Sequence, residues 1–303
     1  MTITKIPFNA ESDFEINVTA AGSAEICKYT GEATQVRIPD KIDGSSVTGI
    51  ANTAFFGLEE LTDIILPDGV ITIGDGAFSL CAELKHITIP ESVVTIGKTA
   101  FLGCKSLEAV SIPQKLSGIE YGVLSLCTSL TKITIPSGIM VISPEAFLGC
   151  EKLETVVLPD GVTLIGERAF ENCTELVNIN IPESVVTIGE RAFQNCASLT
   201  SFIIPSGVTI INNGTFNGCS SLEQVTIPDS VQQIGGSAFM SAEKLKSIVI
   251  PDSVSGINMN AFMDCSSLEN VEYKGETYSA AENSWRRWDL PDAFYDAVNY
   301  KEE

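Results

Sequence analysis

The stretch IPESVVTIGKTAF, from Ile89 to Phe101, recurs almost unchanged as IPESVVTIGERAF from Ile181 to Phe193. The two copies begin 92 residues apart, which is four times 23. Two such similar stretches cannot both be a unique active-site loop. We therefore interpret the segment as a structural unit that recurs along the chain.

The prolines reveal the period of this unit. Nine prolines that follow an aliphatic residue are spaced by 23 residues: Pro67, Pro90, Pro113, Pro136, Pro159, Pro182, Pro205, Pro228 and Pro251. Pro39 precedes them by 28 residues, so the first unit carries a five-residue insertion around residues 43–46. A fixed period in the twenties predicts a solenoid.

Written from the proline, the unit reads P-[DES]-[GS]-V-x-x-I-G-x-x-A-F-x-x-C-x-x-L-x-x-I-x-I. The isoleucine six residues after the proline is present in all ten units once the insertion is allowed for: Ile50, Ile73, Ile96, Ile119, Ile142, Ile165, Ile188, Ile211, Ile234 and Ile257. Phenylalanine holds its position in nine units of ten, and Leu124 replaces it once. We expect these positions to form the core.

Each part of the unit predicts a local structure. The run L-x-x-I-x-I ends in an alternation with period two, which predicts a short strand such as residues 154–158. Proline has no amide donor and ends that strand. The V-x-x-I step predicts a second short extended piece, and A-F-x-x-C a single helical or 3₁₀ turn. The glycine after the isoleucine, for example Gly74, suits a corner or a positive φ.

One unit cannot bury its apolar face alone, whereas stacked units can, because like positions form columns about 4.8 Å apart. We expect an α/β solenoid of about ten coils, strand-rich, with short parallel strands and single helical turns. Parallel strands joined in this way should wind right-handed.

The repeat resembles the leucine-rich repeats of the BspA-like type, which share the run I-P-x-x-V-x-x-I-G-x-x-A-F-x-x-C-x-x-L. The resemblance covers residues 34–273. It implies a curved leucine-rich-repeat solenoid, a bacterial cell-surface or secreted location, and a role in adhesion or protein binding. We expect an N-terminal cap at residues 1–33 and a C-terminal cap at residues 274–303.

The two ends lack the period. Residues 13–29 alternate and turn near Gly22, which predicts a β-hairpin cap. Residues 279–282 have capping-box spacing ahead of Trp285 and Trp288, which predicts a short helical cap over the last coil. A cation–π platform at these tryptophans is the alternative interpretation.

Charge limits the classes of partner. The formal charge is −21, with 18 basic and 39 acidic residues, which argues against nucleic acid. No apolar run is long enough for membrane insertion, and the first fifteen residues lack the features of a secretory signal. A cytoplasmic location is therefore the alternative to the surface location that the resemblance implies.

Eight of the nine cysteines occupy one position of the repeat: Cys81, Cys104, Cys127, Cys150, Cys173, Cys196, Cys219 and Cys265. A linear column does not converge on one point, so we expect no metal site. Disulfides are harder to exclude on distance, but parallel Cβ vectors disfavour them. We expect buried free thiols that act as small apolar filler.

Enzymatic chemistry has little support, because His86 is the single histidine and has no local motif. We expect no catalytic residues and no cofactor.

The residues that point outward from the predicted strands form the candidate binding strip: Ile65, His86, Thr88, Ser111, Lys132, Thr134, Val157, Asn180, Ile203, Thr226 and Val249. Most are uncharged. Carboxylates follow six of the nine regular prolines: Asp68, Glu91, Asp160, Glu183, Asp229 and Asp252.

Two interpretations of the strip remain open. Thr, Val and Ile on the outside of a strand are also what β-propensity alone selects. The functional interpretation is a concave, mostly uncharged surface for a protein or peptide partner, with a host surface or matrix protein as one candidate. We expect a monomeric binding or adhesion module. A structural spacer of a larger surface protein is the alternative, and an enzyme with a site on the concave face is the third.

Overall fold

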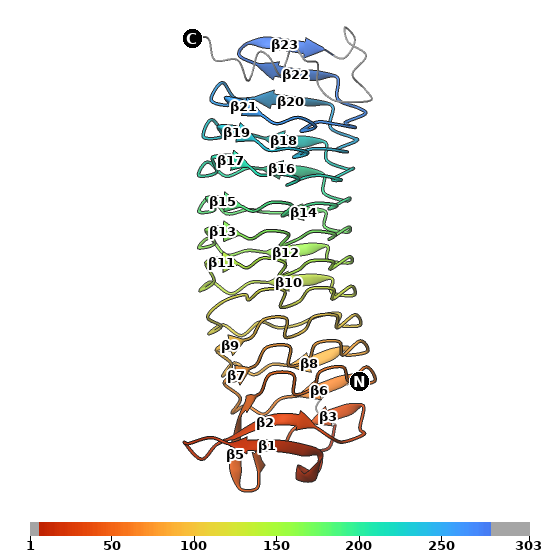
Figure 1. Cartoon of the computed structure of the whole chain (residues 1–303), viewed down its shortest axis with the longest axis vertical. Helices are drawn as coiled ribbons and strands as arrows, with labels where there is room; N and C mark the ends of the chain where they lie inside the picture. The colour runs from red at the N-terminus through yellow and green to blue at the C-terminus, as the bar shows by residue number, and fades with distance from the viewer. Residues whose placement is uncertain (1–5, 280–303) are drawn as a thin grey trace. The chain divides into compact units, whose positions relative to one another are not determined.

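The computed structural model describes residues 6–279, and these form two compact units. The first comprises residues up to 139 together with 146–153, and the second comprises 140–145 together with the residues from 154 onward. Each is a β-solenoid in which most repeats supply two short strands (Figure 1). We call the strand that ends just before the proline the first strand, and the strand that ends at the invariant isoleucine the second strand.

The first unit begins with the 3₁₀ helix η2 (Glu11–Asp13) and strands β1 (Phe14–Val18) and β2 (Ala24–Tyr29). Its first strands are β3 (Gln35–Arg37), β6 (Asp63–Ile65), β8 (His86–Thr88) and β10 (Lys132–Thr134). Its second strands are β5 (Ser45–Ile50), β7 (Thr72–Ile73) and β9 (Thr95–Ile96), and β4 (Lys41–Ile42) pairs antiparallel with β5.

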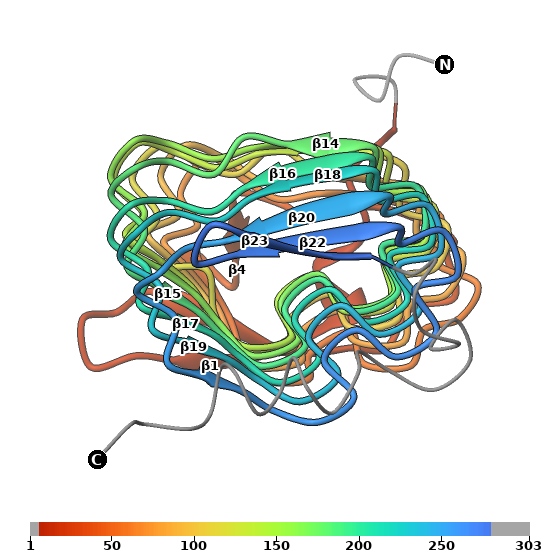
Figure 2. The same cartoon turned by 90° about the horizontal axis from the view of Figure 1, so that it is seen from above.

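The second unit follows the same plan. Its first strands are β12 (Thr155–Val157), β14 (Asn178–Ile179), β16 (Ser201–Ile203), β18 (Gln224–Thr226), β20 (Ser247–Ile250) and β22 (Asn270–Tyr273). Its second strands are β11 (Val141–Ile142), β13 (Leu164–Ile165), β15 (Thr187–Ile188), β17 (Ile210–Ile211), β19 (Gln233–Ile234) and β21 (Gly256–Ile257). Figure 2 shows the two strand sets on different sides of the coil.

Strands pair with their counterparts in the next repeat, parallel and in register. In the first unit Ile64 lies opposite Ile87, and in the second unit Phe202 lies opposite Val225. Both of these register steps are 23 residues, so the sequence period becomes the spatial period, whereas the step from β3 to β6 is 28 residues because of the insertion. The predicted solenoid of short parallel strands is confirmed.

The phenylalanines form stacked columns inside each unit. In the first unit ring centroids are 5.0 Å apart between Phe55 and Phe78 and 5.5 Å apart between Phe78 and Phe101. In the second unit the spacing from Phe170 to Phe193 is 5.4 Å, with planes only 8° apart. Burying one such ring contributes about 1.5–3 kcal/mol, and each aromatic pair about 0.5–1.5 kcal/mol more. The column is therefore a principal source of stability.

The A-F-x-x-C segment forms turns instead of the expected helical turn. Along it, backbone bonds within a coil alternate with bonds to the next coil: Ala77 N donates to Gly74 O, whereas Phe78 N donates to Ala100 O. Two columns of residues with positive φ produce this alternation, at Gly76 and Leu80 in this repeat (φ 59° and 61°). Positive φ interrupts a right-handed helix, and half of the amides then reach the neighbouring coil.

The glycine after the invariant isoleucine is required for close approach rather than for positive φ. A Cβ atom on Gly74 would lie 2.5 Å from Asn52 N, and one on Gly189 would lie 2.5 Å from Glu167 N. Neither glycine has a positive φ. The corner of one coil therefore packs directly on the backbone of the coil before it.

The eight cysteines of the repeat are buried thiols, and they do more than fill space. Cys104 Sγ donates to Phe78 O at 3.2 Å, and Cys81 N donates to the same oxygen at 3.2 Å. Seven thiols donate in this way to the coil before their own: Cys81, Cys104, Cys127, Cys150, Cys196, Cys219 and Cys265. Burial raises the pKa of Cys81, Cys150 and Cys219 to about 12, so these thiols stay protonated donors.

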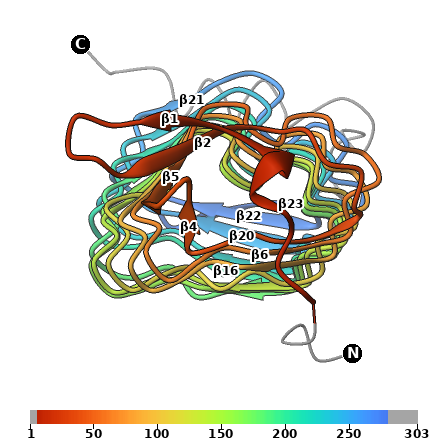
Figure 3. The same cartoon turned by 90° about the horizontal axis from the view of Figure 1, so that it is seen from below.

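The ends differ from the coils between them. β1 and β2 form the antiparallel pair at the N-terminal end of the first unit, beside β5 (Figure 3). In the second unit residues 274–275 turn the chain and β23 (Glu276–Ser279) pairs antiparallel with β22. The start of the expected helical cap, residues 276–279, is thus a strand. The remainder of that cap, with Trp285 and Trp288, lies outside the described residues.

Thiol reactivity tests the buried column. At neutral pH the native protein should react rapidly with a thiol reagent at one cysteine, Cys27, which is exposed. The unfolded, unreduced protein should react at all nine. The Cys27→Ser variant should lose the native reaction. Rapid modification of a second thiol in the native state, or fewer than nine in the unfolded state, contradicts the description.

Glycine substitution tests the close approach of the coils. Gly74→Ala should lower the free energy of unfolding by about 1–3 kcal/mol, because a methyl group there displaces backbone atoms that cannot move aside. Gly138→Ala is the matched control, since nothing lies within 4 Å of its added Cβ and its φ is not positive. It should leave stability unchanged or raise it by about 0.4–1 kcal/mol. Equal effects in denaturant titrations would refute the close approach.

Candidate protein-binding surface

The predicted strip residues lie on the outer face of the first strands. Along β8 the three residues are exposed, buried and exposed in turn, so His86 and Thr88 point to solvent while Ile87 points inward. The other strip residues of the first unit are Lys132 and Thr134, which are exposed, Ile65, which is half-buried, and Ser111, which is exposed in a segment without strand structure.

The strip residues of the second unit include three exposed aliphatic side chains. Val157, Ile203 and Val249 have exposed fractions of 50%, 66% and 59%. Asn180 and Thr226 are exposed in the repeats between them. We call these five residues the strand face. Apolar side chains this accessible on a protein of charge −21 mark a surface that can bury area against a partner.

The register of the strands aligns the strand face. Ile203 pairs with Thr226 between β16 and β18, and Val249 pairs with Glu272 between β20 and β22. Paired residues point to the same side of a parallel sheet. The five strand-face residues occupy the same position of successive repeats, 23 residues apart, on three sheets that contain β12 and β14, β16 and β18, and β20 and β22.

Two grooves join the strand face to the carboxylates that follow the prolines. One, of about 570 Å³, is lined by Asn180 and Ile203 together with Asp160 and Glu183. The geometry places apolar and acidic groups in one depression.

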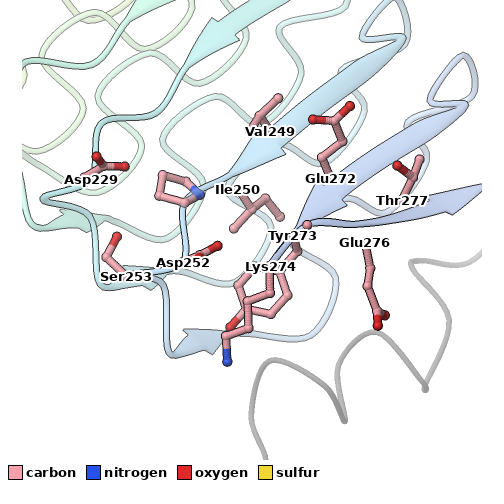
Figure 4. A pocket seen from close by; sticks show the side chains of 12 residues that line it. Asp229, Val249, Ile250, Asp252, Ser253, Glu272, Tyr273, Lys274, Glu276 and Thr277 are labelled. Atoms are coloured by element: carbon pink, nitrogen blue, oxygen red, sulfur yellow. The ribbon is translucent and has the colours of Figure 1, made fainter.

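The other groove, of about 590 Å³, is lined by Val249 together with Asp229, Asp252, Glu272 and Glu276. Figure 4 shows Val249 and Glu272 on neighbouring strands, and Asp229 and Asp252 on the turns beyond the strand ends. A cationic side chain entering either groove meets carboxylates beside aliphatic surface.

Some of the rim carboxylates are fixed by the next repeat. Glu183 Oε2 accepts hydrogen bonds from Ser206 N at 3.2 Å and from Ser206 Oγ at 3.1 Å. In the first unit Glu91 Oε2 accepts from Gln114 N at 3.0 Å. Such bonds orient part of the rim before any partner binds.

His86 lies beside a carboxylate of the preceding repeat. Its Nδ1 lies 2.9 Å from Asp63 Oδ1, and its side chain is 49% exposed. Desolvation acts to raise the pKa of Asp63, but hydrogen bonds from Gln35, Thr62 and His86 outweigh it, so that pKa lies below its ordinary value. The carboxylate of Asp63 therefore stays ionised beside the ring.

The other prominent charged cluster joins coils of the second unit. Arg168 Nε donates to Glu171 Oε2 at 2.6 Å, and Arg168 Nη1 donates to Glu145 Oε1 at 3.1 Å. The hydrogen bond to Glu171 is the main reason that the pKa of Arg168 is raised. Glu171 is buried, so its pairing satisfies a charge that would otherwise be costly.

Within residues 6–279 no three His, Cys, Asp or Glu side chains group as a metal ion would require. The same part of the chain contains no helix that is long and apolar enough to cross a membrane.

Sequence reasoning missed a second set of exposed apolar residues, which lie in the second strands or directly before them. It comprises Ile71 in the first unit, and Met140, Val141, Val186 and Ile210 in the second. Their exposed fractions run from 41% for Val141 to 62% for Met140. The signal was available, because these residues occupy the two positions between the valine and the isoleucine of V-x-x-I.

The comparisons with known proteins agree with this architecture. The family model for the BspA type leucine-rich repeat region matches residues 23–154 and 140–269. The search of curated proteins gives no match.

Solved structures that resemble the chain include the following two. One is a leucine-rich cell surface protein of Faecalibacterium prausnitzii A2-165, with 24% identity, a TM-score of 0.62, and coverage of 99% of this chain and 100% of that one. The other is a leucine-rich repeat protein of Bacteroides ovatus, with 28% identity, a TM-score of 0.54 and coverage of 88% of each chain. With the family model spanning both units, the chain belongs to the family of proteins with BspA-type leucine-rich repeats.

Proposed function

We propose that this chain is a non-enzymatic module that binds a protein or peptide through the strand face of the second unit. The observation that carries the proposal is the exposed column Val157, Ile203 and Val249 beside acidic grooves. When a partner covers this column, each Å² of apolar surface removed from water contributes about 25 cal/mol of favourable binding free energy.

The spacer and enzyme interpretations account for less of the observed surface. A spacer needs no exposed aliphatic side chains at the same position of alternate repeats, and β-propensity favours Thr as readily as Ile or Val. An enzyme would need converging titratable groups, and His86, the single histidine, is paired with Asp63 on an exposed surface.

Membership of the family supports a proposal for the location, oligomeric state and partner of the module. We propose a cell-surface or secreted location and a monomeric state, with a host surface or matrix protein as the partner. The Faecalibacterium protein of similar fold is described as a cell surface protein, which supports this location.

A matched pair of double variants tests the strand face. Ile203→Lys with Val249→Lys should weaken binding of a purified matrix or host-surface protein about tenfold or more, because two exposed apolar contacts become charged. Val186→Lys with Ile210→Lys adds the same charge on the second strands and should change affinity less than about twofold. Binding is measured by biosensor against a panel of such proteins.

Thermal melting provides the folding control, since exposed substitutions usually change stability by less than about 0.5 kcal/mol. Equal losses in the two double variants would attribute binding to general charge. If no panel member binds the wild-type protein, or if both variants bind as it does, the proposal fails.

A further inference from the structure

We propose that a hollow on the second strands of the second unit, lined by the carboxamides of Asn212, Asn213, Gln233 and Asn258, binds a neutral saccharide such as the terminal sugar of a glycan. This site is separate from the strand face and goes beyond the proposed function. It follows from the pairing of three strands, from departures from the repeat that open the hollow, and from the chemistry of the side chains that line it.

The hollow has a volume of about 300 Å³ and lies on β17, β19 and β21, which are neighbours in one sheet. Ile210 pairs with Gln233 between the first two of these strands, and Gln233 pairs with Gly256 between the last two. Paired residues of parallel strands point to the same side of a sheet. These three positions therefore share one surface.

The hollow forms where the sequence departs from the repeat. The position directly after the invariant isoleucine is asparagine at Asn212 and Asn258, whereas it is glycine in five other units: Gly74, Gly97, Gly166, Gly189 and Gly235. The position directly before that isoleucine is glycine at Gly256, whereas it is threonine in three other units: Thr72, Thr95 and Thr187. These departures add carboxamides in the repeats before and after Gly235 and leave space beside Gln233.

Hydrogen bonds within the unit orient two of the carboxamides. Asn212 Nδ2 donates to Ile188 O at 2.6 Å, so the amide group is held in place and its oxygen can accept a hydrogen bond from a ligand. Asn213 Oδ1 accepts from Gly236 N at 2.8 Å, and Asn213 Nδ2 donates to Glu190 Oε1 at 3.1 Å. Asn213 therefore forms a fixed wall of the hollow.

The other two carboxamides are available to a ligand. Gln233 and Asn258 are exposed and make no side-chain hydrogen bond within residues 6–279. A carboxamide donates from its nitrogen and accepts at its oxygen. Neighbouring hydroxyl groups of a sugar also donate and accept, so a hydroxyl pair can bond to both ends of one carboxamide. Ile210, which is 43% exposed, supplies aliphatic surface for the C–H face of the ring.

Charge and size favour a small, uncharged ligand. No charged side chain of the described residues lines this hollow, whereas each groove beside the strand face contains at least two carboxylates. A cationic ligand would find no ion pair here, and an anionic ligand would be repelled by a protein of charge −21. The volume lies at the lower end of the range for small-molecule sites, about 300–1,000 Å³, which suits a monosaccharide or disaccharide.

Saturation-transfer NMR tests the class of ligand. The probes are the methyl glycosides of glucose, galactose, mannose, fucose, N-acetylglucosamine and N-acetylgalactosamine. The controls are the methyl glycoside of N-acetylneuraminic acid, which is anionic, and a Ser-Gly-Ser peptide with blocked ends. At least one neutral glycoside should receive saturation from the wild-type protein. If none does, or if either control gives an equal or larger signal, the proposal is overturned.

A matched pair of double variants locates the site. Gln233→Ala with Asn258→Ala should weaken binding of the glycoside about fivefold or more, because two side chains that bond to its hydroxyls are removed. Gln224→Ala with Asn270→Ala removes one glutamine and one asparagine from exposed positions of the first strands in the same unit. This control should change affinity less than about twofold. Equal losses in the two variants would rule out the hollow as the site.

The substitution Gly256→Thr tests the shape of the hollow without disturbing the fold. It introduces the residue found at Thr72, Thr95 and Thr187, the φ of Gly256 is not positive, and threonine favours strands. The melting temperature should therefore not fall. The added side chain occupies the space beside Gln233, so glycoside binding should be lost. A folded variant that binds as the wild-type protein does would contradict the location.

Two further variants separate this site from the proposed function. Ile203→Lys with Val249→Lys should leave glycoside binding unchanged, whereas Val186→Lys with Ile210→Lys should weaken it, because Ile210 lines the hollow. The two variants are expected to have the opposite effects on a protein partner. If a glycoside binds and no panel protein does, the proposed function fails alone. If a panel protein binds through the strand face and no glycoside binds, the saccharide site fails alone.

Discussion

Stacking of one coil on the next is the constraint on which the rest of this structure depends. A single 23-residue coil has two strands of two to six residues and cannot bury its phenylalanine alone. Placed against its neighbour, the same coil gains ring contacts such as Phe78 to Phe101 at 5.5 Å, and amide bonds such as Phe78 N to Ala100 O. Local structure is therefore a consequence of the repeat interface.

Much of this architecture could be predicted from the sequence, because the period carries the register. Once residues 23 apart are superposed, the buried phenylalanines and the outward direction of Ile203 follow. The positive φ of Leu80, the close packing of Gly74 on Asn52 and the bond from Cys104 to Phe78 O could not be predicted. Each depends on where the backbone of the adjacent coil lies, and a consensus sequence does not contain that position.

The same stacking turns outward positions into surfaces. Side chains inside the coil must match their neighbours above and below, whereas outward ones such as Asn180 and Ile203 differ freely between repeats. The period thus sets a scale of about 4.8 Å for anything that binds along the column. Sequence reasoning identified the column but not its grooves, because these form where the strand face meets turns of neighbouring repeats.

A double-mutant cycle measures the stacking most directly. Phe78→Leu and Phe101→Leu, alone and combined, should show a coupling free energy of unfolding of about 0.5–1.5 kcal/mol, because the two rings are in contact. The cycle of Phe55→Leu with Phe101→Leu, two repeats apart in the same unit, should be additive within about 0.5 kcal/mol. Additivity in both cycles would contradict direct stacking of adjacent coils.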